Sequence, residues 1–160
     1  MGEEFDDADR RFAIAFNNEV WDLLAKPRRS AAEDSRMVHA AHASCIHWLS
    51  AGTPVHHQRA LWLLSRVYAE LGNAAEAKRY AAQCAALTER ARDLLAPFDL
   101  AYAMEALARA HAVAGEVEQA LRNRRDAVAL AEAVEDEEAR ALTLDDIRSG
   151  NWGALEKEHA

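Results

Sequence analysis

Apolar and small side chains recur every three or four residues along most of this chain. That spacing places them on one face of an α-helix, so it predicts amphipathic helices packed side by side. The pattern is clearest in residues 58–87, where two such stretches flank a Leu-Gly-Asn sequence and predict a helical hairpin. One face of the first stretch carries Leu61, Leu64, Tyr68 and Leu71, and one face of the second carries Ala77, Tyr80, Ala81 and Cys84.

Glycine and capping residues mark where the helices begin and end. Gly72 and Gly115 follow apolar stretches and predict helix ends, because glycine adopts positive φ without steric cost. Ser30 and Glu33 have the spacing of a capping box, and Asn73 is suited to cap the following helix. Seven helices are expected, over about 5–26, 30–50, two within 58–87, 97–114, 117–134 and 137–148, followed by a turn at 150–153 and a frayed tail at 154–160.

The hairpin of residues 58–87 resembles a tetratricopeptide repeat. That motif has a leucine-containing first helix, a glycine turn and a small residue early in its second helix, and a second copy surrounds Gly115. The two turn glycines are 43 residues apart, against a usual period of about 34. We expect the extra residues to lengthen the helix around Thr88–Leu95 before Pro97. The matching positions are Leu61, Leu64, Ser65, Tyr68, Gly72, Ala77, Tyr80 and Cys84 in the first copy and Met104, Leu107, Ala108, His111, Gly115, Ala120 and Ala127 in the second.

The resemblance implies an all-α fold, a short right-handed superhelix of antiparallel helical hairpins with about seven helices. The stretch HAAHASCIHW, followed by RALWLLSRVY, is similar to bacterial proteins of this helical-repeat kind. We expect a single domain over residues 1–160. Its parts are a degenerate first hairpin (1–52), a clear repeat (54–95), a second repeat (97–134) and a capping helix (136–149).

Charge and hydropathy narrow the functional classes. The net charge of −8 argues against a general nucleic-acid binder, because phosphate backbones select basic surfaces. No apolar run approaches the roughly 20 residues that cross a bilayer, and the acidic N-terminus lacks the apolar core of a signal peptide. Cys45 and Cys84 are far apart in the sequence and suggest reduced thiols. We therefore expect a cytoplasmic protein that binds neither nucleic acid nor membrane.

The first helices of the two repeats carry a candidate binding groove. In proteins that this chain resembles, the first helix of each hairpin lines a concave surface. Guanidinium groups bind carboxylates through paired hydrogen bonds, and flat aromatic rings supply contact area at low entropic cost. We predict a non-catalytic module that binds a protein or peptide in this groove, and an open end of the array also allows a homodimer. The predicted groove residues are Arg59, Trp62, Arg66, Tyr102, Glu105 and Arg109.

A structural interpretation of the same residues stays open. The arginines can pair with Glu70 and Glu105 across helix turns while Trp62 packs in the core. The lysine and asparagine that carboxylate-clamp repeats use are absent from these positions, so the resemblance does not imply clamp-type binding.

The histidines suggest a different function. Five of the seven lie between positions 39 and 57, and His39 and His42 are about 60° apart on a helix, close enough to share a ligand. The alternative hypothesis is therefore a metal- or small-anion-binding pocket between the first three helices, which includes an enzyme with a histidine acid or base. A divalent metal ion would bind His39 and His42, in a pocket made of Asn17, His39, His42, Trp62 and Arg66. The simpler interpretation is that each histidine packs between helices with one hydrogen bond.

Motifs of common enzymes are missing from the sequence. It contains no phosphate loop, dinucleotide-binding loop, nucleophile elbow or paired-cysteine zinc site. Cys45 follows His42 by three residues, but nothing supplies the third group that orients such a nucleophile pair. A role for Cys45 in the core is simpler, and we favour a function without catalysis and without a cofactor.

Overall fold

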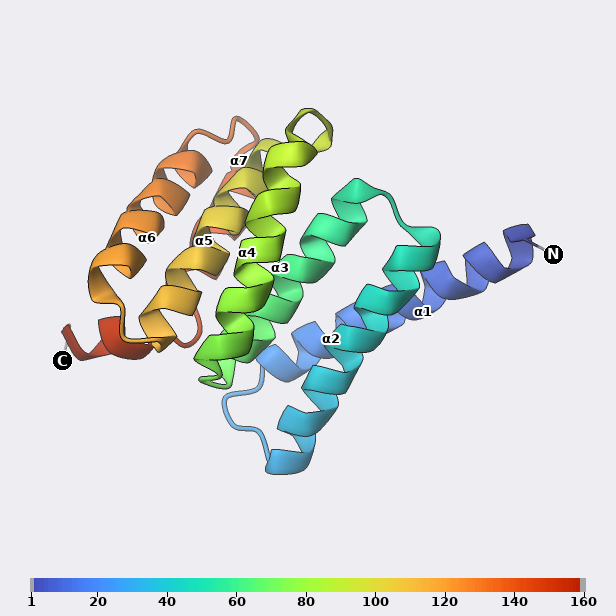
Figure 1. The fold of residues 1–160 in the computed structure, drawn as a ribbon, viewed down its shortest axis with the longest axis horizontal. Coiled ribbons are helices and arrows are strands. Elements are labelled where there is room, and N and C mark those ends of the chain that lie inside the picture. The colour runs from blue at the N-terminus through green and yellow to red at the C-terminus, as the bar shows by residue number, and fades with distance from the viewer. Residues whose placement is uncertain (1, 159–160) are drawn as a thin grey trace.

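The computed structural model describes residues 2–158, with side-chain surroundings for residues 6–156. This part of the chain forms seven α-helices and two short 3₁₀ helices, and it contains no strand (Figure 1). The all-α class and the expected number of helices are confirmed. The helices are α1 (Gly2–Leu24), α2 (Ala31–Ala51), α3 (Pro54–Glu70), α4 (Ala74–Arg90), η1 (Arg92–Leu94), α5 (Pro97–Val113), α6 (Val117–Glu132), α7 (Glu137–Arg148) and η2 (Gly153–Glu158).

Local sequence signals account for most of the helix ends. The Ser30 side chain accepts a hydrogen bond from the Glu33 N–H and the Glu33 carboxylate accepts one from the Ser30 N–H, so the capping box predicted for α2 is formed. Asn73 accepts a hydrogen bond from the first turn of α4. Gly72 and Gly115 follow α3 and α5 at φ of +71° and +77°, the left-handed conformation that glycine adopts without strain.

The connection between α4 and α5 differs from the expectation. The helix ends at Arg90 instead of continuing through residues 88–95, and a single 3₁₀ turn follows at Arg92–Leu94. The side chains of that turn are exposed, so no apolar face holds a longer helix against the core. Ala96 is extended, at φ −72° and ψ 154°, because the ring of the next residue, Pro97, disfavours helical backbone before it.

The segment after α7 also differs from the expectation of a frayed tail. Residues 153–158 form the 3₁₀ helix η2, and Leu155 is only 2% exposed. Trp152, just before it, is 4% exposed and packs with Leu155 among small side chains of α5 and α6. These two apolar side chains fix a segment whose polar residues suggest disorder. Residues 159–160 of the expected tail lie outside the described part of the chain.

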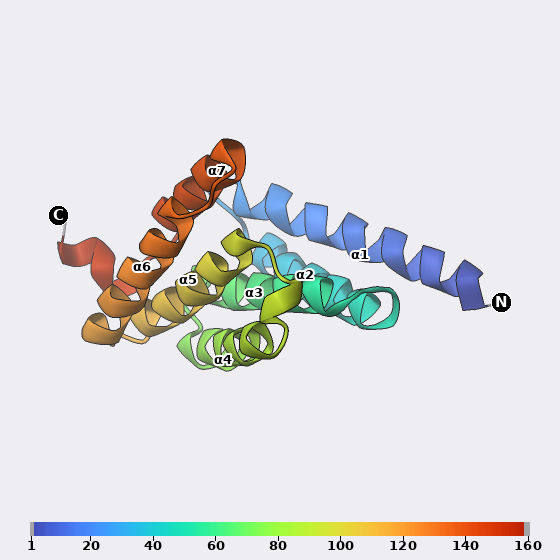
Figure 2. The same ribbon diagram turned by 90° about the horizontal axis from the view of Figure 1, so that it is seen from above.

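The helices stack as three hairpins followed by a last helix. The pairs α1–α2, α3–α4 and α5–α6 pack together, and α3 also touches α5 directly, as α5 touches α7. Figure 2 shows α1 and α7 on the same side of the layer that contains α3 and α5, with α4 on the opposite side. Helices α3 and α5 are therefore flanked, on one side of the molecule, by the first and the last long helices of the chain.

Small side chains let neighbouring helices approach closely. Ala77, Ala103 and Ala108 are completely buried where α4 and α5 pack against their neighbours. Ser65 on α3 donates a hydrogen bond to the Ala77 carbonyl of α4 at 3.0 Å, a contact that requires close helices. None of the described helices is long and apolar enough to cross a membrane.

Candidate functional site

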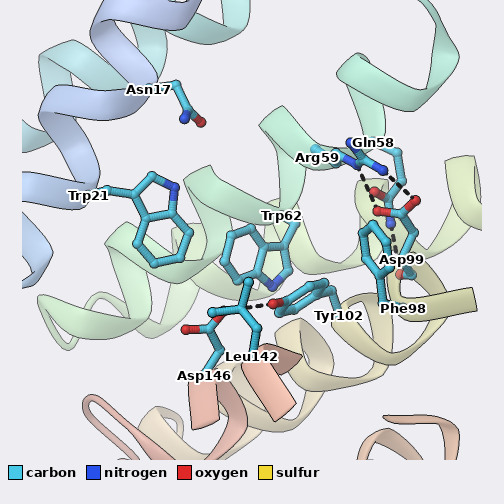
Figure 3. Close-up of a pocket in the computed structure, with 10 residues that line it drawn as sticks. All are labelled: Asn17, Trp21, Gln58, Arg59, Trp62, Phe98, Asp99, Tyr102, Leu142 and Asp146. Carbon is cyan, nitrogen blue, oxygen red and sulfur yellow. Dashed lines mark hydrogen bonds and ion pairs between the residues drawn. The ribbon is translucent and has the colours of Figure 1, made fainter. Parts of the chain in front are cut away.

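A pocket of about 500 Å³ lies between α1 and α7, on the side of the molecule that these helices share (Figure 3). Helices α3 and α5 form its floor, and α1 and α7 form its walls. The volume is in the range of pockets that hold drug-sized ligands or several residues of a peptide. Its lining residues are Asn17 and Trp21 from α1, Gln58, Arg59 and Trp62 from α3, Phe98, Asp99 and Tyr102 from α5, and Leu142 and Asp146 from α7.

Four aromatic rings form one continuous wall of this pocket. The ring centroids of Trp21 and Trp62 are 5.6 Å apart, those of Trp62 and Tyr102 are 4.8 Å apart, and those of Tyr102 and Phe98 are 6.2 Å apart. The Arg59 guanidinium lies over the Phe98 ring, 5.1 Å from its centroid. Because the rings project from three packed helices, they present a rigid apolar surface that loses little entropy when it binds a ligand.

An ion pair closes one end of the pocket. Arg59 donates two hydrogen bonds to Asp99, from Nε to Oδ1 at 2.8 Å and from Nη2 to Oδ2 at 3.0 Å. The Asp99 carboxylate is buried and also accepts a hydrogen bond from the Ala96 N–H, which caps the start of α5. The charge of Arg59 is therefore already balanced by a fixed carboxylate.

Beside this ion pair, Gln58 is completely buried and leaves one polar atom unpaired. Its Nε2 donates to the Asp99 carbonyl and to the Thr88 hydroxyl, both at 3.1 Å. The Asp99 carbonyl can only accept, so it fixes which end of the amide faces it. The Gln58 Oε1 atom then has no hydrogen-bond partner among the described residues.

Asp146 stands at the other end of the pocket. Its Oδ2 accepts a hydrogen bond of 2.6 Å from the Tyr102 hydroxyl, and no hydrogen bond from a described side chain reaches its other oxygen. Partial burial raises the pKa of Asp146 above its ordinary value, against the opposing effects of the Tyr102 hydrogen bond and of Arg66. Burial likewise raises the pKa of Tyr102.

Beneath the pocket floor, a buried charge cluster joins α3 to α5. Glu105 is inaccessible to solvent and accepts hydrogen bonds from Trp62 Nε1 at 2.6 Å, from Arg66 Nη1 at 3.0 Å and from Arg109 Nε. Burial by itself would raise the pKa of Glu105, but the two guanidinium groups outweigh it and hold the pKa below its ordinary value. Glu105 is therefore an anion at neutral pH although it has no access to solvent.

The remaining donors of these two arginines bind the end of α7. Arg109 donates to the carbonyls of Asp146 at 2.8 Å, Ser149 at 2.6 Å and Asn151 at 3.1 Å. Arg66 donates to the Asp146 carbonyl at 3.4 Å. The last carbonyls of a helix have no partner within the helix, so the two arginines act as its cap. Residues 146–151 thus cover the part of the groove where the sequence placed a ligand.

The six residues predicted for the groove fall into two groups. Three of them line the open pocket: Arg59, Trp62 and Tyr102. The other three, Arg66, Glu105 and Arg109, form the buried cluster underneath. Arg109 pairs with Glu105 across one helix turn, as the structural interpretation expected. Arg66 reaches the same Glu105 from another helix, and Arg59 pairs with Asp99.

Several pocket residues come from segments outside the predicted groove. Phe98 lies one helical turn before Tyr102 and so shares its face, a signal that the spacing contained. Trp21 comes from α1, whose sequence carries no signal that links it to α3. Leu142 and Asp146 come from α7, and no local pattern connects that helix with α3 or α1.

The residues of the alternative pocket do not come together in one site. Asn17 and Trp62 line the aromatic pocket, whereas His39 is exposed on α2 and Arg66 belongs to the buried cluster. His42 faces α3 and α4, where its Nε2 lies 2.9 Å from the Tyr68 hydroxyl. Burial lowers the pKa of His42, which favours the neutral ring.

The other histidines of the cluster have separate partners. His47 Nδ1 lies 2.6 Å from an Asp9 oxygen, and His57 Nε2 lies 2.8 Å from the Trp48 carbonyl. His56 stacks on Trp48, with ring centroids 4.2 Å apart. Within residues 6–156, no group of three or more histidine, cysteine or acidic side chains is arranged to hold a metal ion.

The two cysteines lack the surroundings of a nucleophile. Both are free thiols. Burial raises the pKa of Cys45 above its ordinary value and raises that of Cys84 to about 12. A reactive cysteine needs the opposite shift, toward a stable thiolate.

Comparisons with family models, with curated proteins and with solved structures give no match to this chain.

Proposed function

We propose that this chain is a non-catalytic binding module and that an extended segment of a partner protein docks in the aromatic pocket between α1 and α7. The observation that carries the proposal is the continuous wall of four rings in an open pocket of about 500 Å³. Aromatic side chains dominate the anchoring residues of peptide-binding surfaces because they add contact area at low entropic cost.

The proposal includes a tetratricopeptide-like arrangement of the helices. Two features support it: the glycine turns that end α3 and α5, and the direct packing of α3 against α5. In a repeat of this type the first helices of successive hairpins share one surface, and here α3 and α5 supply the pocket floor. The free thiols of Cys45 and Cys84 support a cytoplasmic setting.

The chemistry of the lining residues favours binding over catalysis. Its members are aromatic, amide, leucine, arginine and aspartate side chains, without histidine, cysteine, serine or lysine. Asp99 is held by Arg59, which leaves Asp146 as the single lining carboxylate without a charged side chain bonded to it. One carboxylate supplies no nucleophile–base pair.

A display library of short random peptides tests the proposal. The library is selected on the wild-type protein and the enriched peptides are then measured against two variants. Leu142→Arg places a charged side chain at the pocket wall, where the leucine is 61% exposed, so the change does not disturb the core. Leu94→Arg is the matched control, because Leu94 is 63% exposed and lies away from the pocket.

We expect enriched peptides to share a sequence pattern, to bind wild type and Leu94→Arg equally, and to bind Leu142→Arg about tenfold more weakly or worse. Peptides that bind all three proteins alike would show that the pocket is not the docking site. Failure of the selection to converge on any pattern would overturn the proposed function itself.

A further inference from the structure

We propose that the docked segment inserts a basic side chain, lysine or arginine, against the Asp146 carboxylate and beside the Trp21 and Trp62 rings that line the pocket. This inference rests on the proposed function and names the chemistry that the pocket selects. It reverses the charge expected from the sequence, where the guanidinium groups of the groove suggested a ligand with carboxylates.

A cationic ligand is favoured because the three arginines of the predicted groove already have carboxylate partners within the protein. Arg66 and Arg109 are 6% and 1% exposed and share Glu105, and their remaining contacts go to backbone carbonyls at the end of α7. Arg59 is bound by both oxygens of Asp99. None of the three has its charge left for an incoming carboxylate.

Two carboxylate or amide oxygens among the pocket-lining residues have no hydrogen-bond donor in the described part of the chain, whereas the unpaired buried donor, Arg66 Nε, does not belong to the lining. One oxygen of Asp146 receives no hydrogen bond from a described residue, and Gln58 Oε1 is buried without a partner. An acceptor without a donor is unfavourable in a partly buried site, so a ligand that supplies donors to Asp146 gains most here. The ammonium and guanidinium groups of lysine and arginine carry donors only.

The aromatic wall adds a second attraction for a cation. Figure 3 shows Asp146 on the side of the pocket where Trp21 and Trp62 lie, with Arg59 and Asp99 at the other end. Indole faces attract a cation within about 6 Å of the ring centroid, more strongly where water is excluded. Partial burial of Asp146, which raises its pKa, shows that this end of the pocket disfavours an isolated anion and gains from a neighbouring cation.

The occupant is a side chain of a peptide and not a free ion. A volume of about 500 Å³ exceeds what a single ammonium group fills, and the aromatic wall continues past Trp62 to Tyr102 and Phe98. Residues on either side of the basic side chain would cover those two rings.

Amino-acid amides test the inference with the indole N–H signals of the protein as the reporter. ¹⁵N-labelled protein is titrated with N-acetyl-lysine amide, N-acetyl-arginine amide, N-acetyl-norleucine amide and N-acetyl-glutamate amide. Trp21 and Trp62 line the pocket, whereas Trp48 and Trp152 do not and serve as internal controls. The lysine and arginine amides should shift the Trp21 and Trp62 signals with saturation, and the other two amides should not.

The variant Asp146→Asn removes the charge and keeps an acceptor for Tyr102. It should weaken binding of the lysine and arginine amides by about tenfold, a typical effect of losing one charge-assisted hydrogen bond. Asp145→Asn is the matched control, because that neighbouring carboxylate is 77% exposed and pairs with Arg148 outside the pocket. It should leave the affinity unchanged.

The outcomes separate this inference from the proposed function. Equal shifts with the norleucine or glutamate amide, or equal affinity in the two variants, would overturn the choice of a cation. Library peptides that need the open pocket but contain no basic residue would also overturn it and leave the peptide-binding function standing. Should neither amides nor selected peptides affect Trp21 and Trp62, both proposals fail. The comparison of lysine with norleucine uses wild-type protein, so it decides the matter even if a variant folds poorly.

Discussion

Glu105 is the residue whose charge holds the centre of the molecule together. It has no solvent access and is surrounded by the Trp62 indole and by the guanidinium groups of Arg66 and Arg109. Removing one partner from a buried ion pair is more costly than the pair is worth, because the remaining charge stays without solvent or counter-ion. Loss of the Glu105 charge would leave both Arg66 and Arg109 buried without a counter-ion.

The variant Glu105→Gln should therefore unfold at a lower urea concentration than wild type at neutral pH. We expect a loss of about 3–5 kcal/mol in the free energy of unfolding, the usual cost of breaking a buried pair. Glu118→Gln breaks an exposed pair with Arg122 and should cost less than about 1 kcal/mol. Similar losses in both variants would contradict a special role for the buried charge.

The contribution of Glu105 to stability should also depend on pH. The folded-state pKa of Glu105 lies below its ordinary value of 4.5, so its contribution to stability is complete above that pH. The contribution is lost as the pH falls below 4.5 toward the folded pKa. The difference in stability between wild type and Glu105→Gln should accordingly shrink in that acidic range, and a difference that stays constant down to the acid transition would speak against it.

At the scale of single elements, the sequence was sufficient wherever the signal was local. The capping box of Ser30 and Glu33, the Asn73 cap and the glycines after α3 and α5 each act within a few residues, so spacing alone predicts them. The two errors arose where the outcome depends on distant packing. Nothing near α4 shows that its extension would lack a surface to cover, and nothing near the tail shows that α5 and α6 would bury Trp152 and Leu155.

A matched pair of glycine substitutions tests how η2 is attached. Gly72 and Gly153 both have positive φ, +71° and +51°, so alanine is strained at either position by about 1–2 kcal/mol. A Cβ at Gly72 meets nothing within 4 Å, but one at Gly153 would lie 2.7 Å from the Ala112 carbonyl oxygen and 2.8 Å from the Val113 Cα. Both contacts are with the backbone of α5, which cannot rotate away.

Gly153→Ala should therefore destabilise the protein by roughly 1–3 kcal/mol more than Gly72→Ala, the usual cost of forcing an atom into packed structure. Urea unfolding measures the difference, and limited proteolysis should cut the Gly153→Ala tail first. Equal stability of the two variants would mean that η2 is not held closely against α5.

At the scale of the whole molecule, the candidate site is an assembly of four helices that are far apart in the sequence. Repeat spacing predicted that α3 and α5 share a surface, and this is why Arg59, Trp62 and Tyr102 were identified. The repeat spacing did not indicate which residues of α7 would face that surface. Asp146 of α7 lies 44 residues after Tyr102, its hydrogen-bond partner. Arg66 and Arg109 are buried because backbone carbonyls at the end of α7 accept their hydrogen bonds. Any residue type can supply a backbone carbonyl, so the sequence of this segment did not indicate the contact.

If the hairpins form an array in which each one contacts only its neighbours, damage at one end should stay local. Trp152 joins the last elements: its ring lies 4.1 Å from the Arg109 guanidinium and 4.4 Å from that of Arg124, and its indole donates to the Ile147 carbonyl at 3.0 Å. Trp48 has the corresponding place at the other end, packed with Ala13 and Ala60. Substituting either residue by alanine removes a buried indole of similar size.

Hydrogen exchange followed by mass spectrometry should then separate the two variants. In Trp152→Ala we expect faster exchange in α6, α7 and η2, because these elements lose the ring that joins them, and unchanged exchange in α1 and α2. Trp48→Ala should show the reverse, with faster exchange in α1 and α2 and normal protection in α6 and α7. Helix α3 packs on α2, α5 packs on α6 and α7, and the two pack on each other, so their exchange should respond less than that of the end beside the substitution. A uniform loss of protection in either variant would show instead that the described helices unfold as one cooperative unit, and the pocket between α1 and α7 would then depend on both ends equally.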